Sequence, residues 1–196
     1  MTDEIILQTS GIMLFGKYGL SDVIIKDGGL AKYISLNPVM VPHSTAKHAN
    51  RWFGKSKVNI VERLINNMMR TEVFTGKKMK AYRATKDAFA IIELKTKKNP
   101  VQVLVEALEN AAPREEITRL QFGGISVPKA VDVAPSRRSD IALRNICRGA
   151  IKSSFKNTKS IEQCLADEIM LAAKGDMNSF SVSKKEEVER VAQSAR

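Results

Sequence analysis

Apolar residues recur at helical spacing along most of the chain after residue 58. The clearest run places five apolar side chains at i, i+3, i+4, i+7 and i+8 and predicts a core-facing helix over 58–71: Val61, Leu64, Ile65, Met68 and Met69. Similar spacing predicts five more helices, which cover about 79–96, Asn99 to Pro113, about 137–155, Ser160 to near Gly175, and Ser183 onward. Capping residues support these starts, because Asn99 precedes Pro100 and both Ser160 and Ser183 stand three residues before Gln or Glu.

A different period interrupts the helices between residues 115 and 134. β-Branched and apolar residues flank Gly123-Gly124 there, and paired glycines supply the positive φ angles of a tight hairpin turn. A two-stranded ribbon is marginal in water by itself, so we expect this hairpin to project from the body and to be ordered by a partner. Ahead of residue 59 the pattern is less regular, and Ile12–Phe15 and Val23–Ile25 fit short strands. The sequence therefore predicts a mainly α fold, a six-helix body with an inserted projecting β-hairpin and a less regular N-terminal extension.

The overall composition narrows the class of protein. With 196 residues, of which 43% are hydrophobic and 27% charged, the chain is globular and long enough for a folded core. No apolar run approaches the roughly 18 residues of a membrane helix, and the start MTDEIILQTS lacks the features of a secretory signal. Two cysteines, Cys147 and Cys164, fit a reducing cytoplasm. A formal charge of +11 then points to a polyanionic partner, and no membrane partner is expected.

The cations are concentrated in two parts of the chain. Residues 43–98 hold fourteen cations and four anions, and residues 137–159 hold seven cations and the single anion Asp140. Residues 1–42, in contrast, are close to neutral. An excess that served solubility alone would be spread more evenly, although a merely solvated basic surface stays an alternative. We therefore predict two basic zones on an otherwise balanced protein.

The predicted helix over 137–155 carries the sharpest signal. At 100° per residue four cations share one arc of about 120°, and the opposite arc is apolar. These cations are Arg144, Arg148, Lys152 and Lys156, and Arg137 extends the arc. Like charges at i+4 mildly destabilise a free helix, and a phosphate backbone along the stripe would relieve that repulsion. The pattern favours nucleic acid as the partner over a plain solvated helix face.

The loop His43–Lys57 belongs to the first basic zone and has its own character. It holds four cations and no acid, and the aromatic pair Trp52-Phe53 stands among them. Cations beside aromatic rings suit RNA, because rings stack on unpaired bases while ammonium groups meet phosphates. The alternative for the two rings is that they anchor this loop to the helical core.

No catalytic constellation emerges from the sequence. Gly54-Lys55-Ser56 is similar to the end of a phosphate-binding loop, but Ala49 stands where that loop needs its first glycine. His43 and His48 have no Cys or acid beside them, and Cys147 lies on the apolar arc of its helix. We expect no catalytic residue, no metal and no cofactor.

Several stretches together resemble one protein family. They read KVNIVERLINNMMR, NPVQVLVEALENAAPRE, FGGISVPKAVDVAPSRRSDIALRNI and CLADEIMLAAKGD, with the ending KKEEVERVAQSAR. Upstream, LFGKYGLSDV and VPHSTAKHANRWFGK extend the likeness to nearly the whole chain, apart from about the first ten residues. The chain thus resembles small-subunit ribosomal protein seven in its archaeal form, whose eukaryotic counterpart is small-subunit protein five.

This resemblance implies a function and a set of contacts. It implies a cytoplasmic structural constituent of the small ribosomal subunit, a primary binder of the 3′ major domain of its RNA that nucleates assembly of the head. The hairpin would lie near the exit site, messenger and transfer RNA, with proteins of the ninth and eleventh families as neighbours. Carried onto this chain, the rRNA-binding residues are Lys47, Arg51, Lys55, Lys57, Lys77, Lys78, Arg137, Arg138, Arg144, Arg148 and Lys152. The hairpin residues that would face the exit site are Arg119, Gln121, Phe122, Gly123, Gly124 and Lys129.

The expected organisation is an N-terminal extension and basic arm over 1–58 and a helical RNA-binding domain over 59–196, with the hairpin at about 115–134. Two other classes of function stay open on the residues alone. A DNA-binding architectural protein also combines helices with a projecting ribbon, and Phe122 could be its wedge, but this ribbon has only Arg119 and Lys129 as cations. An RNA-modifying enzyme would need a nucleophile, a metal cluster or a cofactor loop, and the sequence offers none of these.

Overall fold

Six long helices form the body of the protein in the part of the chain that the computed structural model describes, residues 11–72 and 74–196. They are α3 (Ile60–Met68), α4 (Lys78–Thr96), α5 (Pro100–Ala111), α6 (Pro135–Ser154), α7 (Ile161–Lys174) and α8 (Phe180–Ser194). Each corresponds to one helix predicted from apolar spacing. The prediction of a mainly α fold with an inserted hairpin is therefore confirmed.

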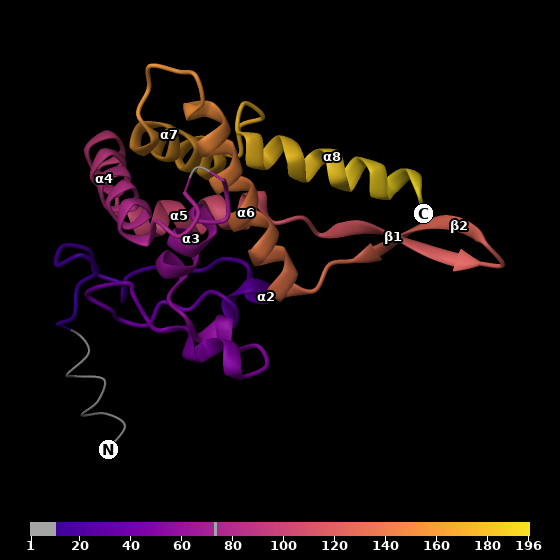
Figure 1. The fold of residues 1–196 in the computed structure, drawn as a ribbon, viewed down its shortest axis with the longest axis horizontal. Coiled ribbons are helices and arrows are strands. Elements are labelled where there is room, and N and C mark those ends of the chain that lie inside the picture. Colours follow the sequence, from indigo (N-terminus) through magenta and orange to yellow (C-terminus); the bar gives the residue numbers. More distant parts are fainter. Residues whose placement is uncertain (1–10, 73) are drawn as a thin grey trace.

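Two helices, α5 and α7, lie at the centre of this body. α7 packs against α4, α5 and α6, which gather around it (Figure 1). α5 begins where the sequence predicts, because the Asn99 side chain accepts a hydrogen bond from the backbone N–H of Val101 at 3.0 Å and Pro100 occupies the first turn. Large side chains from three helices meet with almost no exposed surface: Phe89, Leu104, Leu108, Leu143 and Ile146. This shared burial is the main force that holds the helices together.

The segment before α3 is less regular than the body, as expected, but the two predicted strands are wrong. Among its described residues, Leu14 and Tyr18 form an isolated bridge, and Val23–Ile25 runs beside α5 without a partner strand. The Gln102 side chain accepts from the Ile24 N–H at 2.8 Å and donates to the Ile24 carbonyl at 3.1 Å. Side chains of a helix thus satisfy the backbone groups that a neighbouring strand would otherwise satisfy.

Short helical turns interrupt this N-terminal segment. They are α2 (Gly28–Ala31) and two 3-10 turns, η1 (Ala46–Asn50) and η2 (Gly54–Lys57). Apolar side chains of the segment, among them Leu14, Leu30 and Ile34, are buried in the same core as the helices. The segment is therefore packed onto the body and leads directly into α3.

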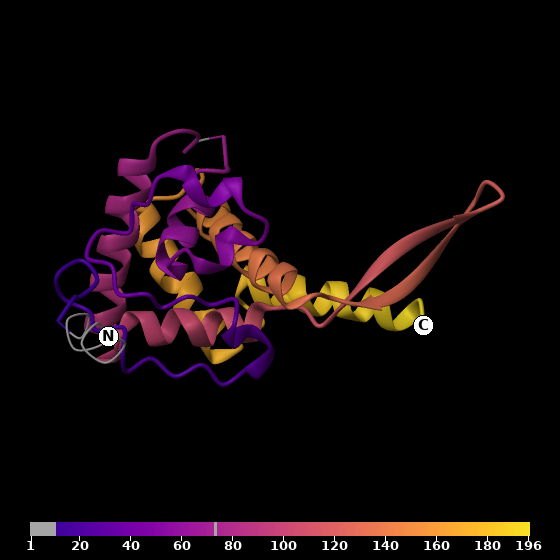
Figure 2. The ribbon, with the colours of Figure 1, turned by 90° about the horizontal axis from the view of Figure 1, so that it is seen from below.

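The hairpin forms as predicted, from β1 (Glu115–Phe122) and β2 (Ile125–Asp132). Its antiparallel register runs from Glu115 opposite Asp132 to Phe122 opposite Ile125, which leaves Gly123-Gly124 as a two-residue turn. Both glycines have positive φ, 54° and 88°, as a type I′ turn requires. The ribbon reaches far beyond the helices (Figure 2), so its predicted projection is confirmed.

Helix α8 begins earlier than predicted and braces the base of the hairpin. Its N-cap is Ser179, not Ser183, because the buried Glu168 of α7 accepts hydrogen bonds from the Ser179 hydroxyl at 2.8 Å and the Ser181 N–H at 2.9 Å. At its other end, the Ala195 carbonyl accepts from the Ala130 N–H of β2 at 3.2 Å. The C-terminus accordingly lies beside the base of the hairpin (Figure 1).

Candidate nucleic-acid interface

Residues 43–57, which we call the basic arm, fold as two 3-10 turns packed on each other. The Gly54 N–H donates to the Arg51 carbonyl at 3.1 Å and closes a turn between η1 and η2. A Cβ atom at Gly54 would overlap the His48 carbonyl oxygen, so the two turns approach each other too closely for any larger residue. This close approach thus explains the glycine of Gly54-Lys55-Ser56, the sequence that is similar to part of a phosphate-binding loop.

Two buried or half-buried carboxylates attach the basic arm to the helices. Glu62 of α3 accepts from the Ser44 N–H at 2.8 Å and from Lys78 Nζ at the start of α4 at 3.0 Å. Asp140 of α6 pairs with Lys55 of the arm and, at 2.8 Å, with Arg63 of α3. The arm, α3, α4 and α6 are therefore joined at one side of the molecule.

The electrostatics of Asp140 explain why this link is firm. Burial by itself raises the pKa of the Asp140 carboxyl, but the hydrogen bonds and charges of Lys55 and Arg63 outweigh burial and hold the pKa below its usual range. The carboxylate is thus charged at neutral pH. Of the eleven nominated rRNA-binding residues, Lys55 is therefore partly neutralised within the protein.

Three of the four cations predicted to form a stripe along α6 do so. Arg144 is half-buried, and Arg148 and Lys152 are exposed and follow it at steps of one turn. Lys156 is not on the stripe, because α6 ends at Ser154 and Lys156 adopts a left-handed conformation with φ of 53°. The prediction that Lys156 belongs to the stripe is therefore wrong.

Arg70 joins this stripe and was missed in the sequence. It follows the C-terminus of α3 and lines a hollow together with Asn67, Thr71, Arg144 and Arg148. Within the described residues no carboxylate comes within ion-pair distance of these three arginines. Three unneutralised guanidinium groups around one hollow repel each other, and an oxyanion placed there would relieve the repulsion.

Two other nominated arginines at the start of α6 are held by carboxylates of the protein itself. Arg137 makes a bidentate pair with Glu116 of β1 at 2.7 and 2.8 Å, which lowers the pKa of Glu116 and raises that of Arg137. Arg138 pairs with Asp27 at 2.8 Å, and its side chain is only 12% exposed. These contacts fix the N-terminal segment and the hairpin base to α6.

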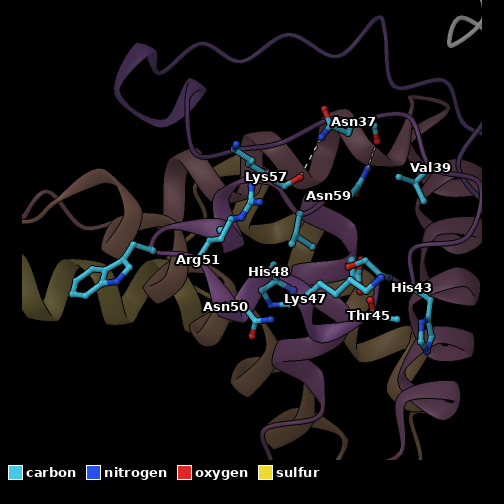
Figure 3. Close-up of a pocket in the computed structure, with 15 residues that line it drawn as sticks. Asn37, Val39, His43, Thr45, Lys47, His48, Asn50, Arg51, Lys57 and Asn59 are labelled. Carbon is cyan, nitrogen blue, oxygen red and sulfur yellow. Dashed lines mark hydrogen bonds between the residues drawn. The ribbon is translucent and has the colours of Figure 1, made fainter. Parts of the chain in front are cut away.

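The nominated residues of the arm lie around an open pocket. Lys47, Arg51 and Lys57 line it together with polar side chains of Asn37 and His48 (Figure 3). The described part of the chain supplies no ion-pair partner to these three cations. Two further nominated residues lie at the start of α4. Lys78 is paired with Glu62, and Lys77 is the N-cap residue of the helix.

These pieces form one basic surface, which we define by its members. It runs from the arm across the Lys55–Asp140 link to the α6 stripe, because Arg144 lies one turn after Asp140. Its members are Lys47, Arg51, Lys55, Lys57, Arg70, Arg144, Arg148 and Lys152. The two basic zones of the sequence are therefore one surface in the fold.

The aromatic pair of the arm does not anchor it to the core. Trp52 is 94% exposed and Phe53 is 67% exposed. The anchoring interpretation is therefore wrong, since both rings face solvent among the cations of the basic surface.

The nominated hairpin residues lie on the projecting ribbon. Arg119, Gln121 and Lys129 are exposed, as are the two glycines of the turn, Gly123 and Gly124. The side chain of Phe122 lies outside the described part of the structure. The ribbon therefore offers a narrow exposed surface with two cations, far from the basic arm (Figure 2).

Cys147 of α6 is placed for structure. Cys147 is fully buried, donates to the Leu64 carbonyl at 3.6 Å, and has its pKa raised by burial. Across the residues described, no three His, Cys, Asp or Glu side chains come together as a metal site would require. The helices described are also too short or too polar for any of them to span a membrane.

A helical body with one continuous basic surface and a projecting ribbon defines a class, the basic proteins built to bind a polyanion. Residues 30–196 match the sequence model of the family described as ribosomal protein S7p/S5e, and the chain belongs to that family. It is thus a structural, non-enzymatic constituent of the small ribosomal subunit.

Curated relatives agree over nearly the full length. The chain is 60% identical to the small ribosomal subunit protein uS7 of Thermoplasma volcanium, over 94% of this chain and 100% of the relative. Proteins of the same name from Picrophilus torridus and Archaeoglobus fulgidus are also 60% identical over 94% of this chain, and the match covers 98% and 95% of their own lengths. The archaeal type predicted from the sequence motifs is confirmed.

Proposed function

We propose that this protein is a primary binder of the 3′ major domain of small-subunit ribosomal RNA and nucleates assembly of the subunit head. The observation that carries the proposal is the basic surface, where several cations have no partner among the described carboxylates. Those cations are Lys47, Arg51, Lys57, Arg70, Arg144, Arg148 and Lys152. A phosphate backbone laid across the arm and α6 would neutralise them, and the described carboxylates do not supply that charge.

The paired cations have a different role in this proposal. Lys55, Lys78, Arg137 and Arg138 each hold a carboxylate from a distant part of the chain. The pairs of Lys55, Arg137 and Arg138 fix the arm, the hairpin base and the N-terminal segment to α6, and the pair of Lys78 joins α4 to α3, so that the binding surface is formed before RNA arrives. Such preorganisation lowers the entropy cost of binding.

The hairpin is proposed to lie near the exit site, beside messenger RNA and exit-site transfer RNA. Small-subunit proteins of the ninth and eleventh families would be its neighbours in the subunit. Support comes from its exposure and from the brace of α8, which directs the ribbon away from the basic surface. A ribbon held only at its base can reach a second partner while the body stays bound to RNA.

The test is the salt dependence of binding by the full chain to RNA of the 3′ major domain. Seven cations of the basic surface lack a described ion pair, so the slope of log affinity against log salt is expected to be about −5 to −6. RNA of another ribosomal domain and a DNA duplex serve as competitors, and both are expected to compete weakly. A slope near −1, or equal competition by DNA, would overturn the proposal.

A further inference from the structure

The tip of the basic arm presents two aromatic rings to solvent among cations. We propose that Trp52 and Phe53 form a stacking platform for unpaired RNA bases, so that the arm binds a single-stranded or looped segment. The inference rests on the proposed function, because it names the kind of RNA that this part of the basic surface takes.

Backbone geometry forces both rings outward. They occupy the two central positions of the turn that the Gly54 N–H closes on the Arg51 carbonyl at 3.1 Å. Phe53 has a φ of 55°, a left-handed conformation that is unfavourable for a residue with a Cβ atom. The Ser56 hydroxyl donates to the Phe53 carbonyl at 2.7 Å and helps to hold this conformation. The fold therefore maintains a strained turn whose effect is to display two rings.

Their exposure is unusual for residues of this kind. Aromatic side chains normally bury most of their surface, and 94% of Trp52 remains in water. The core beneath the arm is complete without them, since Val58, Ile60 and Val61 are buried at the start of α3. A ring that contributes nothing to the core and is held away from it is suited to a ligand with a flat apolar face.

The charges around the turn decide which ligand that is. Lys47, Arg51 and Lys57 lie beside it, and the two acids that contact the arm, Glu62 and Asp140, are already paired within the protein. A polyanion with flat apolar faces fits these surroundings, and nucleic acid is such a polymer. In a duplex the faces are stacked on each other, so only unpaired bases can lie on the rings.

A pocket next to the turn extends the platform. Its volume is about 800 Å³, and its polar lining includes Asn50, His43 and Asn37 (Figure 3). The side chain of Asn37 donates a hydrogen bond to the Lys57 carbonyl. A base displaced from its stack could enter there and meet hydrogen-bonding groups, while its neighbour lies on a ring. The arm thus combines stacking, hydrogen bonding and phosphate contacts, which is the usual composition of a surface for unpaired RNA.

Trp52 is the single tryptophan of the chain, so its fluorescence reports on this site alone. The full-length protein is titrated at low salt with oligoadenylate, with a blunt RNA duplex of equal phosphate count, and with 3′ major domain RNA. Stacking is expected to quench the emission with oligoadenylate and with the domain RNA, and to leave it nearly unchanged with the duplex.

Substitutions separate the ring from the charge. Trp52→Leu is expected to weaken oligoadenylate binding by about fivefold or more and to leave the salt slope unchanged, because the ring carries no charge. Trp52→Phe keeps a ring and should restore most of the affinity. Leu94→Ala removes another exposed apolar side chain, 79% exposed on α4, and should have no effect. Lys47→Gln should instead reduce the salt slope by about 1.

The outcomes distinguish this inference from the function on which it rests. Steep salt-dependent binding of 3′ major domain RNA with unchanged emission, and equal affinity of Trp52→Leu, would overturn the stacking platform and leave the proposed function standing. The exposed rings would then point to a protein partner. Failure of every RNA to bind would overturn both.

Discussion

Reversing the charge of Arg144 and Arg148 separates binding from folding on α6. The double substitution Arg144→Glu with Arg148→Glu lowers the formal net charge from +11 to +7 and leaves the apolar arc of the helix intact. Both side chains line the hollow with Arg70 and have no described carboxylate partner. Carboxylates at these positions would replace repulsion of Arg70 by attraction. Since such surface pairs are each worth about 0.2–0.5 kcal/mol, the free energy of unfolding should change by less than about 1 kcal/mol.

Binding should change far more than stability. Each arginine is proposed to donate to a phosphate, and hydrogen bonds to charged groups are worth about 1.5–3 kcal/mol each. Losing two of them costs at least about 3 kcal/mol, which is roughly a hundredfold in affinity. Two fewer phosphate contacts should also make the salt slope shallower by about 1.5. Filter binding of 3′ major domain RNA across a salt series measures both quantities, and urea unfolding measures stability.

The matched control makes the same change in net charge elsewhere. Lys17→Glu with Lys98→Glu alters two exposed lysines that line a hollow with Tyr18 and Glu93, away from the basic surface. This control should keep its salt slope and enter small subunits in cells, whereas the arginine variant should be absent from them on sucrose gradients. The reasoning is refuted if both variants lose the same affinity, because net charge alone would then explain binding. It is equally refuted if the arginine variant unfolds.

Three further outcomes test how the surface and the hairpin are held. Gly54→Ala should push the turn away from the His48 carbonyl, so that limited proteolysis cuts the basic arm faster while helical circular dichroism is unchanged. Deletion of residues 119–128 with a short turn in their place should leave cooperative thermal unfolding nearly unaltered, because this part of the ribbon is outside the core; a large fall in melting temperature would contradict that. The lowered pKa of Asp140 means that its link to Lys55 is complete above the unfolded pKa of about 3.9 and is lost as pH falls through the lower folded value. The protection factors of the arm's amides, which compare exchange with that of the unfolded chain at the same pH, should therefore fall in acid, and Asp140→Asn should abolish that change in protection.

The helices could be predicted because their information is local. Apolar residues three and four apart select a helix wherever it lies in the fold, and Asn99 and Ser160 cap α5 and α7 through contacts within three residues. The start of α8 was not predictable in this way. Ser179 becomes its cap because Glu168 of another helix holds the hydroxyl, and no residue near Ser183 in the sequence carries that information.

The prediction of two N-terminal strands is wrong for a related reason. Val23–Ile25 has the β-branched composition of a strand, but the groups that satisfy the backbone there and just after it are the side chains of Gln102 and Glu109, about eighty residues later. The sequence of an extended segment does not show whether a strand or the side chains of a helix will satisfy its backbone groups. The hairpin, in contrast, brings its own partner strand and its own glycine turn, so its prediction needed nothing from elsewhere.

The basic surface also combines features that local sequence predicts with features that depend on distant residues. Cation density predicted where the surface lies, but whether a cation is available to RNA depends on carboxylates that are distant in sequence, such as Asp27 for Arg138 and Glu116 for Arg137. Arg70 was overlooked for the opposite reason, since it joins the α6 stripe only through the packing of α3 against α6. A cation held by an acid of the protein positions the surface, and a cation without one is left to attract a phosphate. Neutralising Arg138 should therefore weaken RNA binding only through a change of fold, whereas neutralising Arg148 should weaken it directly.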